Sequence, residues 1–95
     1  MKTFSELLTQ GNALLTSLEV DNPTIEAIDS ALTWLSEVAF TCEAAPSMAY
    51  DSGSDTYNLV GLYGSCKAAL AYVGNVKYLK NMFLSVHAQV KSIVE

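Results

Sequence analysis

Arginine is absent from this chain of 95 residues, and histidine and tryptophan occur once each. Most specific nucleic-acid readers depend on arginine for bidentate contacts with phosphate and guanine, so its absence disfavours direct DNA or RNA binding. The single histidine, His87, has no second histidine and no Cys-x-x-Cys spacing to complete a zinc site. No nucleophile, base and orienting group can be assembled from the sequence, so we predict a non-enzymatic protein without a metal or cofactor.

Cysteine and long apolar runs are also scarce. Cys42 and Cys66 are the only cysteines, and we predict buried free thiols, with a Cys42–Cys66 bridge as the alternative. The longest charge-free run, Leu7 to Leu18, has 12 residues, whereas a bilayer-spanning helix needs about 20 apolar residues. The first residues also lack the unbroken apolar core of a signal peptide. We therefore expect a cytoplasmic protein that has no membrane partner.

The composition is that of a folded domain. Hydrophobic residues make up 51% of the chain and charged residues 16%, which differs from the polar, highly charged composition of disordered proteins. A chain of this length has room for one modest core. The sequence predicts a single helical domain over residues 1–95.

In the first half, apolar residues recur at steps of three and four, which is typical of amphipathic helices. Thr3 and Glu6 have the spacing of a capping box, so a first helix begins there and ends near Glu19. Asn22 suits an N-cap and Pro23 the first helical position of a second helix. That second helix ends before Pro46.

The second half opens with the turn-rich residues 47–54, after which Ser54 or Asp55 can cap a helical region that reaches residue 94. The apolar residues keep nearly the same helical register on both sides of Gly74-Asn75. Residues 55–94 therefore form either one helix of about 60 Å or two helices broken or kinked at this pair. A Gly-Asn pair is a common helix stop, which favours the break. The predicted fold is an all-α bundle of three or four helices.

Charges are divided along the chain. Residues 3–55 contain nine acids and no base, whereas residues 56–94 contain four lysines and no acid. An acidic surface of this kind accelerates association with cationic partners. We therefore predict a protein-binding module that docks on a basic protein surface through Glu26, Asp29 and Glu37. A compact acidic chain without catalytic motifs is typical of phage or plasmid accessory proteins that block a host factor.

The second helix has more apolar side chains than a small core can bury. We predict a homodimer in which Trp34 and Val38 meet another copy, with Phe40 part of the same surplus. Small residues in the third helix would let paired backbones approach closely, namely Gly61, Gly64 and Ala68. Two alternatives remain: the second helix is central and surrounded by the others, and the small residues pack within one chain.

Tyrosines and lysines in the second half suggest a different function. An oligomeric protein could sequester a small anionic ligand such as a nucleotide through four residues, Tyr72, Lys77, Tyr78 and Lys80. However, the chain has no glycine-rich phosphate loop, and Gly61 and Gly64 lie inside a helical pattern. This alternative is therefore the less favoured one.

Overall fold

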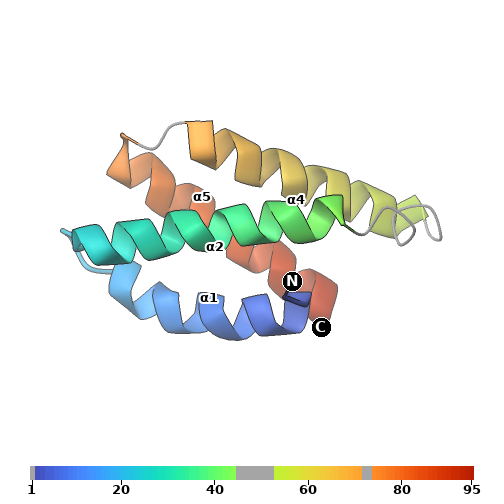
Figure 1. The fold of residues 1–95 in the computed structure, drawn as a ribbon, viewed down its shortest axis with the longest axis horizontal. Helices are drawn as coiled ribbons and strands as arrows, with labels where there is room; N and C mark the ends of the chain where they lie inside the picture. The colour runs from blue at the N-terminus through green and yellow to red at the C-terminus, as the bar shows by residue number, and fades with distance from the viewer. Residues whose placement is uncertain (1, 45–52, 72–73) are drawn as a thin grey trace.

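The fold is a small bundle of four helices, as a computed structural model shows for residues 2–44, 53–71 and 74–95 (Figure 1). No strand occurs within these ranges. The predicted all-α class is confirmed. The helices are α1 (Phe4–Leu18), α2 (Ile25–Glu43), α4 (Gly53–Ala71) and α5 (Val76–Val94).

Helix α2 is the central element of the bundle. It contacts α1 on one side and α4 on the other, and it also touches α5. Helix α5 contacts both α4 and α1, so the four helices close into a ring (Figure 1). Helix α2 therefore contacts all three other helices, as the alternative of a central second helix predicted, but it keeps an exposed outer face instead of being surrounded.

Helix α1 begins at the capping box expected from its sequence. The Thr3 hydroxyl accepts a hydrogen bond from the Glu6 amide at 3.2 Å, and the Thr3 amide donates to Glu6 Oε1 at 3.2 Å. The Thr3 amide, together with the Thr3 hydroxyl, which also donates to Glu6 Oε1, holds the pKa of the Glu6 carboxyl below its ordinary value. The helix ends at Leu18 with Glu19 as its C-cap, as predicted.

The starts of α2 and α4 differ from the prediction. The N-cap of α2 is Thr24, whose hydroxyl accepts from the Ala27 amide at 3.1 Å, so Asn22 and Pro23 precede the helix instead of opening it. The hydroxyl of Thr24 satisfies a free amide of the first turn just as Asn22 would have done two residues earlier. Helix α4 already begins at Gly53, so Ser54 and Asp55 lie within it. Pro46, the predicted stop of α2, lies outside the described residues.

The last helical region is broken at the predicted pair. Helix α4 ends at Ala71 and α5 begins at Val76. Asn75 is the N-cap of α5, with an extended backbone and with its Oδ1 accepting from the Tyr78 amide at 3.0 Å. The break therefore separates two 19-residue helices that fold back against each other.

Apolar residues of all four helices form one core. Cys42 and Cys66 are free thiols within it, as predicted, and burial raises their pKa to about 11 and about 12. None of the described helices is both long enough and apolar enough to cross a membrane. The largest fully enclosed side chains are those of Trp34, Phe83, Leu7, Leu35, Leu62, Leu79, Val38, Val86 and Val90.

Candidate functional site

The division of charge along the sequence becomes a division in space. Helices α1 and α2 are neighbours, and so are α4 and α5. Residues 3–44 contain seven acids and no base, while residues 59–94 contain four lysines and no acid. Among the described residues of these two ranges, the acids therefore belong to the α1–α2 half of the bundle and the lysines to the α4–α5 half, and the two sets meet where Asp21 shares a cleft with Lys77 and Lys80.

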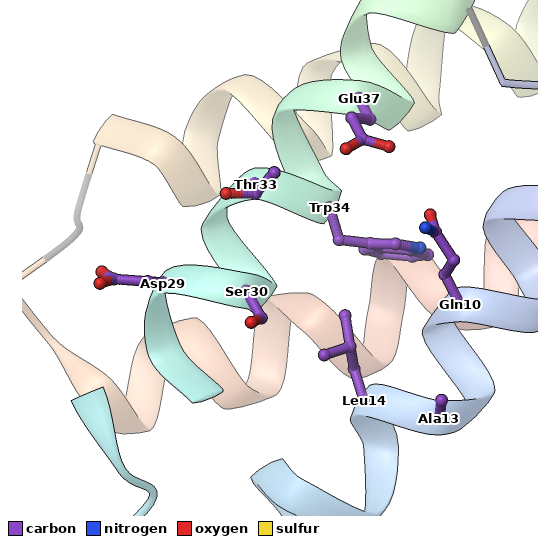
Figure 2. Close-up of a pocket in the computed structure, with 8 residues that line it drawn as sticks. All are labelled: Gln10, Ala13, Leu14, Asp29, Ser30, Thr33, Trp34 and Glu37. Atoms are coloured by element: carbon purple, nitrogen blue, oxygen red, sulfur yellow. The ribbon is translucent and has the colours of Figure 1, made fainter. Parts of the chain in front are cut away.

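A hollow of about 440 Å³ lies on the acidic side, between α1 and α2 (Figure 2). Ala13 and Leu14 of α1 and the indole of Trp34 supply its apolar lining. Asp29 lies at one end and Glu37 at the other, with Ser30 and Thr33 between them on α2 (Figure 2). The hollow thus combines an apolar interior with carboxylates at its ends.

Trp34 fixes the wall of this hollow. Its indole N–H donates to the Leu7 carbonyl at 2.7 Å, which ties α2 to α1. Its ring packs tilted against Phe83 of α5 with centroids 4.8 Å apart. With only 2% of its surface exposed, Trp34 is held by three helices and provides a rigid support.

Gly11 lets α1 approach this support closely. A Cβ atom at this position would lie 2.9 Å from both Trp34 Cζ2 and His87 Cδ2, closer than such atoms can pack. The next residue, Asn12, has its Oδ1 2.7 Å from His87 Nε2. Half-buried His87 is therefore a boundary residue that joins α1 to α5, and burial lowers its pKa from the ordinary value.

A second hollow of about 460 Å³ adjoins the first along α2. It is lined by Lys2, Thr33, Ser36, Glu37, Phe40 and Thr41. Thr33 and Glu37 line both hollows, so the two lie next to each other along α2, and together we call them the α2 groove. Phe40 is 58% exposed at its far end. The sequence grouped Phe40 with Trp34 and Val38 as surplus apolar residues of the second helix. The structure separates them: Trp34 and Val38 are buried, whereas Phe40 remains exposed.

One carboxylate of the groove is already paired. Lys2 Nζ lies 2.7 Å from Glu37 Oε2, and the Thr41 hydroxyl donates to the Lys2 carbonyl at 3.1 Å. This is the only ion pair within the described residues. Glu26 and Asp29, both exposed, are the predicted partner-binding acids whose charge no lysine of the described chain compensates.

The residues predicted for self-association are not brought together. Trp34 and Val38 are 2% and 0% exposed in the core of one chain, so they cannot meet another copy in this fold, and that part of the prediction is wrong. Gly61 and Gly64 are exposed on α4 and Ala68 is half-buried. A Cβ at Gly64 would meet no atom of the described residues within 4 Å, so packing against this part of the chain does not explain the glycine.

The predicted anion-binding residues are only partly assembled. Lys77 and Lys80 line a cleft of about 600 Å³ together with Asp21. Lys80 Nζ donates to the Val20 carbonyl at 2.8 Å, and the Asp21 carboxylate would repel an anion. Tyr78 is half-buried and is not part of the lining, and Tyr72 lies outside the described residues.

Metal binding finds no support within the described residues, where no three His, Cys, Asp or Glu side chains gather to hold an ion. Comparison of the chain with protein-family models, with curated proteins and with solved structures finds no match.

Proposed function

We propose that this protein is a non-enzymatic module that binds a basic surface of another protein through its α1–α2 side. One observation carries this proposal: α1 and α2, with the residues that precede and connect them, contain seven acids and, within the described residues, a single base of their own, Lys2. Lys2 itself is paired with Glu37. Of the remaining acids, Asp21 shares a cleft with Lys77 and Lys80, whereas Glu26 and Asp29 are exposed and form no ion pair within the described residues. The field of this part of α2 therefore faces solvent.

Such a field acts mainly on the encounter between proteins. Opposite charges steer two surfaces together and raise the association rate, and like charges reject wrong partners. Because exposed charges are screened by salt, the affinity for the partner should fall as ionic strength rises. A basic functional surface covered in this way is blocked, which is the inhibitory role that we propose for an accessory protein of this kind.

Binding is preferred over catalysis because the reactive groups of the described chain are unsuited to chemistry. The Cys42 and Cys66 thiols are buried with raised pKa values, so neither forms a thiolate readily at neutral pH. His87 is engaged with Asn12 and packs against the rings of Phe83 and Trp34. These contacts give His87 a structural role.

The experiment compares two double variants of equal net charge. Glu26→Gln with Asp29→Asn removes two negative charges from α2, and Asn81→Lys with Ala88→Lys adds two positive charges to exposed positions of α5. A partner captured from the native cells by affinity mass spectrometry is purified and titrated against each variant at low and high salt. We expect the α2 variant alone to weaken binding and to reduce its salt dependence. Equal weakening by both variants, or a partner that binds through acidic residues, would contradict the proposal.

We propose in addition that the chain forms a symmetric dimer through the outward face of α4. Val60 is 65% exposed there, beside the exposed Gly61 and Gly64, and small residues allow two helices to approach closely. Light scattering coupled to size exclusion tests this proposal. A mass that stays at 10.2 kDa across micromolar concentrations would show a monomer.

A further inference from the structure

The α2 groove follows one side of a single helix. Glu26, Asp29, Thr33, Glu37 and Phe40 recur at steps of three and four, which places them in one row along α2. The two hollows lie along this row and share Thr33 and Glu37. From Asp29 to Phe40 the row measures about 16 Å at the rise of an α-helix.

The two ends of this row differ in chemistry. The first end has the exposed carboxylates of Glu26 and Asp29. At the second end, the Glu37 charge is compensated by Lys2, and the exposed ring of Phe40 is the main feature. Between them, Leu14 and Trp34 line an apolar hollow. A complementary ligand needs a cation at one end and apolar side chains over the rest.

We propose that the α2 groove receives a basic, amphipathic helix of the partner protein, with a Lys or Arg beside Asp29 and an apolar side chain against Phe40. This inference rests on the proposed function, since it specifies what part of a basic partner enters the acidic side. About three helical turns separate the two contacts, so the cation and the apolar residue stand about eleven positions apart in the bound segment.

A helix fits this groove better than an extended segment does. Addition of a strand requires an open sheet edge, and the described residues contain no sheet. A helix needs only a trough between side-chain ridges, which the spacing of neighbouring helices supplies. Apolar residues on one face of the guest would cover Leu14 and Phe40, and its basic residues would remain at the rim.

Trp34 provides a built-in signal for occupation, because it is the only tryptophan and lines the groove. The probe is a synthetic amphipathic helix of about 18 residues made of leucine, alanine and lysine, a length at which isolated helices become stable. Two further peptides serve as controls: one has the same composition in a scrambled order, and one has glutamate in place of lysine. We expect saturable changes in Trp34 fluorescence with the first peptide only.

Pairs of variants, one inside the groove and one outside it, test where on the protein the peptide binds. Asp29→Asn should weaken peptide binding about two- to five-fold, the range of one exposed ion pair, whereas Glu19→Gln removes an equal charge outside the groove and should leave binding unchanged. Phe40→Ala should weaken it about tenfold through lost apolar contact. Its control is Leu84→Ala on α5, where the side chain is 49% exposed.

The possible failures are distinguishable. If Glu19→Gln weakens binding as much as Asp29→Asn and Phe40→Ala weakens it no more than Leu84→Ala, the groove assignment is overturned and the proposed function stands. If the glutamate peptide binds and the lysine peptide does not, both are overturned. Trp34 fluorescence that changes with protein concentration alone, together with a doubled mass that Phe40→Ala abolishes, would assign the groove to a second copy and overturn the proposal.

Discussion

The α1–α2 side and the α4–α5 side are both pairs of antiparallel helices, but glycine has opposite roles in them. Gly11 of α1 lies where any side chain would collide with Trp34 and His87, whereas Gly64 of α4 has open space before it. The acidic side is therefore closely packed beneath its groove, and α4 exposes backbone at Gly64 that none of the described residues covers. The comparison shows that a glycine's role depends on what the helix packs against.

Truncation of Trp34 should destabilise the α1–α2 side more than any other change considered. Trp34→Ala deletes the ring that joins α1, α2 and α5, and we expect a loss of about 3–5 kcal/mol of unfolding free energy. That loss is a large part of the stability of a domain of this size. Urea denaturation followed by circular dichroism measures it.

Phe40→Ala is the control within the same helix. Because the Phe40 ring is 58% exposed, its truncation should cost well under half as much as that of Trp34. Trp34→Phe, which keeps an aromatic ring but loses the bond to the Leu7 carbonyl, should lie between the two. Equal midpoints for Trp34→Ala and Phe40→Ala would refute the assignment of Trp34 as the rigid support.

The two glycines provide a sharper test of the comparison. Gly11→Ala should destabilise the fold by up to about 2 kcal/mol, because overpacking against two rings outweighs the gain in helix propensity of about 1 kcal/mol. In the monomer, at protein concentrations below dimer formation, Gly64→Ala gains the propensity without a collision and should stabilise by about 0.5–1 kcal/mol. If both variants shift the midpoint of thermal or urea unfolding in the same direction, the two sides are packed alike.

The smallest expected effect concerns pH. Burial, and to a lesser extent Lys91, lowers the pKa of His87 below its ordinary value of 6.5. The unfolded chain then binds a proton more readily than the folded protein, so stability should fall as the pH drops below about 6.5 and level off once folded His87 is protonated as well. Urea midpoints of the native chain and of His87→Gln measure this. The same slope in both would exclude His87 as the cause.

Local signals allowed much of the fold to be predicted. The Thr3 and Glu6 box, the stop near Glu19 and the break at Gly74-Asn75 each depend on residues within one turn of each other, so their sequence patterns suffice. The Asn22 cap failed because Thr24, two residues later, offers the same kind of acceptor. The local sequence pattern does not distinguish between neighbouring residues that are equally able to serve as the N-cap of a helix.

The candidate site was less predictable because it depends on tertiary packing. Trp34, Val38 and Phe40 are alike in the sequence as apolar residues of one helix, but only the first two face the other helices. Gly11 lets α1 lie close to Trp34, and Trp34 lines the groove. Asp29 was singled out from charge alone, and its position at the end of a hollow required the structure.

The contact between Asn12 and His87 has a kinetic consequence. It joins residues 75 positions apart and closes the ring of helices. Closing so long a segment of chain costs more conformational entropy than pairing α4 with α5, so we expect the α1–α5 seam to form late in folding. Changes at this seam should then act chiefly on the rate of unfolding and hardly on the rate of folding. The seam would thereby set how long each molecule keeps its groove intact.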